Sequence, residues 1–244
     1  MRTSNPALNA KTFGRFGPGA VTGEAMTIEG AVNRTAFLLL LLAATATWTW
    51  SQTFAGVAVE GYLLGGILGG FVVALVTIFK PAWAPVTAPI YAALEGLALG
   101  AISAYFEARF PGMVIQGVAL TFGVLAALLL AYRSGLIPVT EKFRLGVVAA
   151  TGGIAIFYLV AMGLSFFNIT IPFLHEGSAL GIAFSLFVVV IASLNLVLDF
   201  DFIQQGAQQG APKVAEWYAA FGLIVTLVWL YLEILRLLSK LRSR

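Results

Sequence analysis

The residues that offer chemistry in this chain are a few acids set within otherwise apolar sequence. Asp199 closes the sixth of seven apolar stretches, and Asn195 precedes it by four residues. Residues four apart on a helix share a face, so a helix would place both side chains together. A carboxylate surrounded by hydrocarbon is costly unless it is paired, hydrated or protonated. Asp199 is therefore the first candidate for a functional residue.

Three more acids lie within or beside apolar stretches: Glu95, Asp201 and Glu233. The other acids lie in the N-terminal arm, in loops or at the ends of stretches, where a solvated charge is the simpler interpretation: Glu24, Glu29, Glu60, Glu107, Glu141, Glu176 and Glu216. Two carboxylates close together resist ionising at the same time, so an acidic pair would hold a proton near neutral pH and attract a cation when deprotonated. The alternative is structural: Asp199 anchors its helix, and Glu233 pairs locally with Arg236.

The elements that must position these acids are predicted from composition and length. The chain is 60% hydrophobic and 10% charged, with a mean hydropathy of +0.95, whereas an average soluble domain is about 25% charged. Apolar stretches, each near the roughly 20 residues that cross a bilayer, lie at 36–54, 60–79, 86–106, 112–132, 145–167, 178–198 and 217–238. We expect an all-α polytopic membrane protein, with a polar, flexible cytoplasmic arm at 1–33 and a seven-helix transmembrane domain at 34–244.

The basic residues predict an orientation with one contradiction. With the N-terminus in the cytoplasm, the cytoplasmic positions collect nine Lys and Arg residues, while the first three external loops hold only Arg109. Such a bias indicates a cytoplasmic N-terminus. Seven crossings would then place a basic tail outside: Arg236, Lys240, Arg242 and Arg244. Either the last stretch crosses despite this tail, or one stretch is re-entrant; we favour seven crossings.

Several classes of function are disfavoured by residue content. The chain has no cysteine, which excludes disulfides, thiolate catalysis and sulfur-ligated metals. One histidine, His175, is too few for a histidine-built metal site. A net charge of +3, with the basic residues at helix ends, indicates membrane-flanking charge rather than nucleic-acid binding. We expect no enzymatic activity and no tightly bound cofactor.

Small residues predict close helix packing. Glycines four residues apart let two helix backbones approach each other. This spacing occurs in the second and third stretches, and we assign it to packing rather than to ligand binding: Gly65 with Gly69, Gly66 with Gly70, and Gly96 with Gly100.

The segment Ser193-Leu-Asn-Leu-Val-Leu-Asp-Phe-Asp-Phe-Ile203, followed by a polar loop and Leu230-Tyr-Leu-Glu233, resembles the last two helices of the Bax inhibitor-1 family, specifically its bacterial YccA-like branch. The segment Glu95-Gly-Leu-Ala-Leu-Gly100 resembles the glycine-containing third helix of that family. The resemblance implies a seventh helix at the centre, wrapped by the other six. It also implies a pH-sensitive calcium leak and, for this branch, location in the bacterial inner membrane.

The resemblance also assigns roles to residues. Asp199 matches the acid on the sixth helix, and Glu233 matches the acid on the seventh, so this pair would sense pH and contact the passing calcium ion. Lys80 lies where the family has a basic latch, usually Arg, that closes on the first acid. An alternative register places Thr226 at the second acid, in which case Glu216 or Asp201 substitutes.

Two functions follow as hypotheses. The leading one is a passive cation pathway, with calcium as the transported ion, in which protonation of Asp199 and its partner controls the passage. The other is a regulatory membrane protein that binds and restrains a partner, such as a membrane protease or a cell-death factor, through the N-terminal arm. Deleting the residues before Arg34 would separate the two hypotheses, because only the second predicts loss of partner binding with intact flux.

Overall fold

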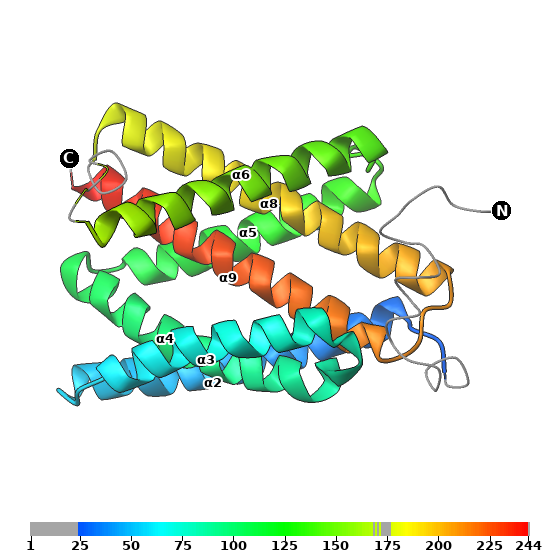
Figure 1. Cartoon of the computed structure of the whole chain (residues 1–244), viewed down its shortest axis with the longest axis horizontal. Helices are drawn as coiled ribbons and strands as arrows, with labels where there is room; N and C mark the ends of the chain where they lie inside the picture. Colours follow the sequence, from blue (N-terminus) through cyan, green and yellow to red (C-terminus); the bar gives the residue numbers. More distant parts are fainter. Residues whose placement is uncertain (1–23, 168, 170, 172–176, 244) are drawn as a thin grey trace. The chain divides into compact units, whose positions relative to one another are not determined.

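The computed structural model describes residues 24–167, 169, 171 and 177–243. Seven long helices follow one another in this part of the chain (Figure 1). They are α2 (Ile28–Phe54), α3 (Glu60–Phe79), α4 (Ala84–Arg109), α5 (Met113–Arg133), α6 (Glu141–Ser165), α8 (Ala179–Gln208) and α9 (Ala215–Arg242), with a short 3-10 turn, η4 (Pro81–Trp83), before α4. The predicted all-α architecture is confirmed.

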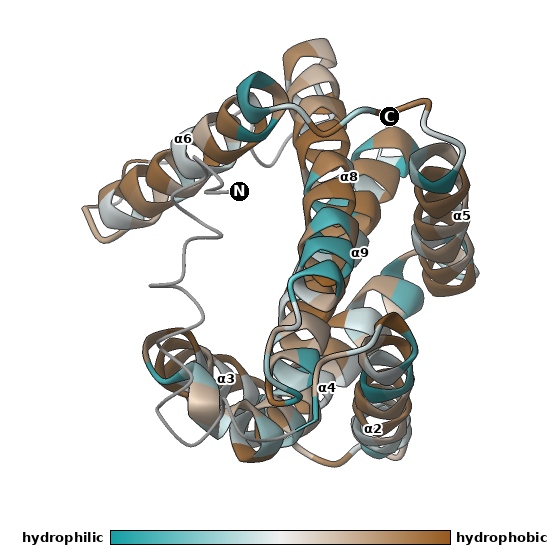
Figure 2. Cartoon of the chain, turned by 90° about the vertical axis from the view of Figure 1, so that its right-hand side faces the viewer, coloured by the Kyte–Doolittle hydropathy of each residue, from teal (hydrophilic) through white to brown (hydrophobic). Residues whose placement is uncertain are grey.

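Each of the seven helices is long and apolar enough to cross a membrane. Most of the residues in the helices are hydrophobic (Figure 2). Large apolar side chains also point outward, for example Leu40, Phe71 and Phe166, which are 72%, 62% and 79% exposed. Such surfaces are unfavourable in water and suit contact with lipid. The chain is therefore an integral, multi-pass membrane protein.

Helix α2 begins earlier than the apolar pattern predicts. It starts at Ile28, so residues 28–33 of the expected arm are helical. The cause is a cap: the Thr27 hydroxyl accepts a hydrogen bond from the Gly30 amide at 2.9 Å, which satisfies one of the free N–H groups at the helix start. The expected boundary at residue 33 is corrected accordingly, and residues 1–23 lie outside the described part.

Helix α8 ends later than predicted, at Gln208 instead of 198. The Gln205 amide donates to Asp201 Oδ2 at 2.7 Å, one turn apart, and such pairs support a helix in polar sequence. The chain then leaves the helix near Gly210, which has φ +64°, a conformation that glycine adopts readily. Asp199 and Asp201 therefore lie within a helix, and most of the predicted polar loop belongs to that helix.

The chain divides into two compact units. Unit 1 comprises Met1–Tyr105 and Asp201–Val225, and unit 2 comprises Phe106–Phe200 and Thr226–Arg244. Helices α8 and α9 thus contribute residues to both units. Each unit is described by itself below.

In unit 1, glycines allow α4 to pack closely on α2 and α3, which run beside it (Figure 1). A Cβ atom added to Gly66 would lie 2.6 Å from the Leu94 carbonyl oxygen, and one added to Gly96 would clash with Thr45 Oγ1 and the Leu42 carbonyl oxygen. Gly65, by contrast, has open space around it. The packing interpretation of the glycine spacing is confirmed for one helix face and does not extend to Gly65.

In unit 2, an apolar cluster joins α6, α8 and α9. Its buried centre consists of Ile154, Val188 and Ile191, and these residues are surrounded by Ala150, Tyr158, Phe184 and Trp229. Helix α5 packs close to α9, since a Cβ atom at Gly117 would lie 2.8 Å from Leu235 Cδ2. Tyr158, one of the polar side chains described next, packs against this cluster.

The glycine contacts generate a first prediction. We expect Gly96→Ala to lower stability by about 1–3 kcal/mol, because the added methyl group forces α2 and α4 apart. Gly65→Ala is the matched control; it should be neutral or slightly stabilising, since Ala favours helix over Gly by up to about 1 kcal/mol. The apparent Tm in detergent, followed by tryptophan fluorescence, measures both. Equal Tm values for the two variants would contradict the proposed close packing.

Candidate functional site

The register of α8 against α9 in unit 2 decides which polar side chains meet. Lys240 Nζ donates to Ser185 Oγ at 2.9 Å, and the side chain of Thr226 hydrogen-bonds with Asp199. Lys240 and Thr226 are fourteen residues apart on α9, and their partners Ser185 and Asp199 are also fourteen residues apart on α8. The two helices are antiparallel, so Glu233, halfway along the α9 interval, lies level with Ala192, halfway along the α8 interval. Ala192 is fully buried.

Asp199 therefore meets a hydroxyl group on α9 and not an acid. Thr226 is buried, with 8% of its surface exposed. Asp199 Oδ2 is buried too, and no hydrogen-bond donor reaches it from the described residues. A buried carboxylate oxygen without a donor is energetically costly. This oxygen is the most unusual polar atom of the interface.

Asn195 extends the polar contacts to a third helix. Its amide nitrogen donates to Thr151 Oγ1 on α6 and to the Ile191 carbonyl oxygen, both at 2.8 Å. Asn195 lies one turn from Asp199 on the same face, as the sequence predicts. We refer to Thr151, Asn195, Asp199 and Thr226 as the Asp199 cluster. Its other members are neutral, so the only ionisable group in this cluster is Asp199.

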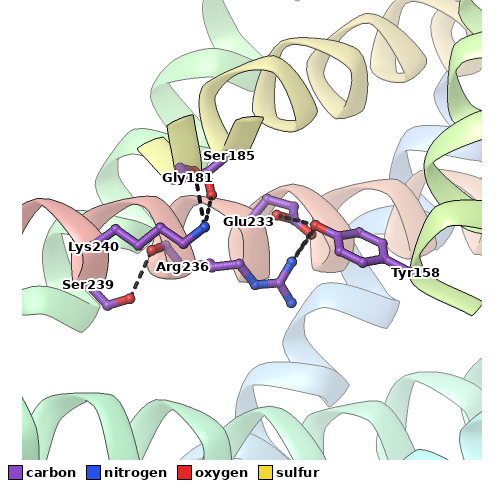
Figure 3. Close-up of polar contacts among 7 residues, drawn as sticks. All are labelled: Tyr158, Gly181, Ser185, Glu233, Arg236, Ser239 and Lys240. Carbon is purple, nitrogen blue, oxygen red and sulfur yellow. Dashed lines mark hydrogen bonds and ion pairs between the residues drawn. The ribbon is translucent and has the colours of Figure 1, made fainter. Parts of the chain in front are cut away.

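A second polar cluster surrounds Glu233 (Figure 3). The exposed fraction of Glu233 is 2%. Arg236 NH1 donates to Glu233 Oε1 at 2.6 Å and to Tyr158 Oη at 2.6 Å. The Tyr158 hydroxyl in turn contacts both carboxylate oxygens, at 3.1 and 3.3 Å. We refer to Tyr158, Glu233 and Arg236 as the Glu233 cluster. The local pairing of Glu233 with Arg236, the structural alternative considered above, is confirmed.

The predicted contact between Asp199 and Glu233 is not formed. Thr226 and Glu233 share a face of α9 but are seven residues apart, a rise of about 10 Å along the helix. Asp199 contacts the first of these residues, whereas the second is paired with Arg236 and accepts a hydrogen bond from Tyr158. The physical reason is the antiparallel register, which is consistent with the alternative alignment of Thr226 to the second acid.

Lys240 was assigned to the basic tail from sequence, but its side chain lies inside unit 2. Its ammonium donates to the Gly181 carbonyl oxygen at 3.0 Å as well as to Ser185 Oγ (Figure 3), and the residue is 3% exposed. In the sequence, the one indication of this position is helical spacing: Lys240 follows Arg236 by one turn and Glu233 by two turns, so it shares their face of α9. The sequence provides no comparable signal for Tyr158, because its partners on α9 lie more than 70 residues away along the chain.

In unit 1, Glu216 is buried at the start of α2. Its Oε1 accepts hydrogen bonds from the Thr27 amide at 3.1 Å and from the Thr27 hydroxyl at 3.2 Å. Arg34 Nε lies 3.9 Å from Oε2, and the carboxylate occupies the space that a Cβ atom of Gly30 would need. A carboxylate at a helix N-terminus is favoured by the free N–H groups there. Glu216 thus anchors α2 to α9.

The chain before α2 is joined to the α8–α9 connection beside this anchor. The Met26 amide donates to the Ala211 carbonyl oxygen at 2.6 Å, and the Lys213 amide donates to the Glu24 carbonyl oxygen at 3.0 Å. The side chains of Lys213 and Glu24 form an exposed ion pair. The hydrogen bond and charge of Lys213 lower the pKa of Glu24. On acidification, this ion pair is therefore lost as the pH falls through that lowered pKa.

A protein-family model described as Bax inhibitor 1 like matches residues 5–243. This chain belongs to the Bax inhibitor-1 family. Among curated proteins, no match was found. The family assignment rests on nearly the whole chain, and its agreement with the seven apolar helices confirms the resemblance seen in the sequence. The YccA-like branch stays a prediction.

The remaining residues predicted for a family-type site lie in unit 1. Glu95 is half-buried on α4, where its Oε2 lies 3.0 Å from the position of a Cβ atom on Gly70. Asp201 is 8% exposed and accepts the hydrogen bond from Gln205 described above. Lys80 follows α3, and its ammonium lies 4.6 Å from the centroid of the Trp83 ring. Since Lys80 and Asp199 belong to different units, the latch stays a prediction.

Whether the protein can hold a metal ion depends on how many ligating side chains gather in one place. Among the described residues, no three Asp, Glu, His or Cys side chains gather closely enough to hold a metal ion, and His175 and Glu176 lie outside the described part. Calcium prefers six to eight oxygen ligands. Asp199 and Glu233 each offer one carboxylate, which suits brief contact with a passing ion better than storage of a resident one.

The Glu216 anchor generates a second prediction. We expect Glu216→Ala to destabilise the protein by about 1–3 kcal/mol, because it leaves the Thr27 donors and Arg34 without their acceptor. Glu29 is an exposed acid in the first turn of α2, and Glu29→Ala should cost less than about 1 kcal/mol. Denaturation in detergent micelles measures both changes. A loss for Glu29→Ala as large as that for Glu216→Ala would argue against a specific anchor.

Proposed function

We propose that the protein is a passive, proton-sensitive cation pathway with calcium as the expected cargo. The observation that carries this proposal is the buried, donor-free Oδ2 of Asp199 inside an apolar helix interface. An ionisable side chain within membrane-spanning helices is rarely retained for stability alone, because its charged form is costly there. Membership of the Bax inhibitor-1 family supports the same proposal.

Charge control by Asp199 is the central step. In its ionised form, the carboxylate places a negative charge in the interface and attracts a cation. In its protonated form this attraction is lost. The Thr226 hydroxyl suits both forms, since a hydroxyl group donates to a carboxylate and also accepts from a carboxylic acid. Protons and calcium ions would thus compete for the same carboxylate.

The neutral surroundings of Asp199 refine this proposal. Two interacting acids release their protons in two coupled steps, whereas the Asp199 cluster contains a single ionisable group with hydroxyl and amide neighbours. We therefore propose a sensor that exchanges one proton, in place of the acidic pair expected from the resemblance.

The ligands available at the Asp199 cluster favour weak binding. One carboxylate, with hydroxyl and carbonyl oxygens nearby, provides fewer oxygens than a calcium ion prefers, so water would complete the shell. Conduction requires an ion to bind well enough to enter and weakly enough to leave. A site of this composition is suited to a slow leak.

Calcium flux into liposomes that contain the purified protein tests the proposal. We expect the flux of the unsubstituted chain to fall as the pH is lowered from about 8 to about 5, because protonation removes the charge of Asp199. Asp199→Asn should show a reduced flux that no longer depends on pH.

Glu141→Gln is the control, since it removes an exposed acid from the first turn of α6 in the same unit. Its flux should follow the unsubstituted chain. The proposal fails if Asp199→Asn retains the original dependence of flux on pH, or if the unsubstituted protein passes no calcium.

A further inference from the structure

The Glu233 cluster has the composition of an occupied cation site. Arg236 NH1, Tyr158 Oη and Glu233 Oε1 contact one another in all three pairs (Figure 3). The guanidinium also lies over the Tyr158 ring, with its central carbon 5.1 Å from the ring centroid. A carboxylate, a phenol oxygen and an aromatic face are all groups that bind cations. Here the bound cation is part of the chain.

Exposure differs sharply between the two charged partners. The Glu233 side chain is 3% exposed, and that of Arg236 is 39% exposed. Removing the partner of a buried charge leaves that charge uncompensated, at a cost well above that of breaking an exposed pair. The buried carboxylate therefore requires a cation, whereas the arginine can leave it for water or lipid headgroups.

The neighbours of Glu233 in unit 2 set the charge of the cluster. Tyr158 faces it from α6, Ala192 is level with it on α8, and Lys240 lies two turns further along α9. The Lys240 ammonium is held by Gly181 and Ser185. With Arg236 in place, these side chains carry one negative and two positive charges, so a second cation would be repelled.

We propose that Arg236 is a tethered cation that occupies a site formed by Glu233 and Tyr158 and excludes mobile cations from it. Departure of the guanidinium exposes an oxygen site for a metal cation, and the positive charge of Lys240 keeps the affinity of that site low. The inference rests on the proposed cation pathway for its physiological meaning, but the site itself can be tested without measuring transport.

Terbium binding to the full-length protein in detergent provides this test. Tb³⁺ prefers the same hard oxygen ligands as calcium, and its luminescence is sensitised by a nearby indole. Trp229 lies one turn before Glu233 on α9 and packs in the adjoining apolar cluster. We expect Arg236→Gln to bind Tb³⁺ at least about tenfold more tightly than the unsubstituted chain, in a saturable manner that calcium reverses.

Two variants show whether the effect belongs to this site. Arg242→Gln removes the same charge from the same helix, but Arg242 donates to the Pro111 carbonyl oxygen at 2.9 Å and to Gln116 Oε1 at 3.0 Å. It should bind Tb³⁺ like the unsubstituted chain. Combining Arg236→Gln with Glu233→Gln should abolish the gain.

A conservative variant covers the case in which Arg236→Gln does not fold. Arg236→Lys keeps the charge but cannot hold both oxygens with a rigid fork of donors, so we expect a smaller gain in Tb³⁺ affinity, of about threefold. The proposal is overturned if whichever of these two variants folds binds Tb³⁺ no more tightly than the unsubstituted chain, which would leave Arg236 and Glu233 as a structural pair only.

Failure of this inference can be told apart from failure of the proposed function. A pH-sensitive calcium flux that depends on Asp199, without any gain of Tb³⁺ binding in the Arg236 variants, would overturn the tethered cation alone. A gain of Tb³⁺ binding in a protein that passes no calcium would overturn the pathway and leave the cation site standing.

Discussion

The cost of placing a carboxylate among apolar helices is the constraint on which the polar architecture of this protein depends. Three acids of the helices satisfy that constraint in different ways. Asp199 has a hydroxyl partner and one oxygen without a donor. Glu233 accepts hydrogen bonds from the Arg236 guanidinium and from the Tyr158 phenol. Glu216 occupies the start of a helix, where backbone N–H groups serve as donors. Of the three, Asp199 is the least compensated, and for that reason it is the group best placed to change its charge.

Most of the fold could be predicted from apolar length alone. Helix α3 has the predicted bounds, 60–79, because the apolar run and the helix coincide there. The start of α2 and the end of α8 could not be predicted in this way, since both extend into polar sequence. A capping threonine produces the first extension and a glutamine–aspartate contact supports the second. A hydropathy pattern indicates which residues are apolar enough to lie in lipid, but a helix can continue past them into polar sequence.

The candidate site could be predicted only in part. The shared face of Asn195 and Asp199 and the pairing of Glu233 with Arg236 both follow from helical spacing within one segment. What the sequence could not specify is the register between α8 and α9, because a shift of two turns changes which α9 residue faces Asp199 without altering either helix. Tyr158 was missed for the same reason, since its partner lies 75 residues away.

The anchor at the start of α2 has a consequence for the order in which the chain matures. Thr27 and Glu216 are separated by 189 residues, so α2 must emerge from the ribosome and enter the bilayer long before its final acceptor is synthesised. Contacts between such distant segments close late in folding. The start of α2 thus stays accessible to other factors during biogenesis and is held in place only after the α8–α9 hairpin has been made.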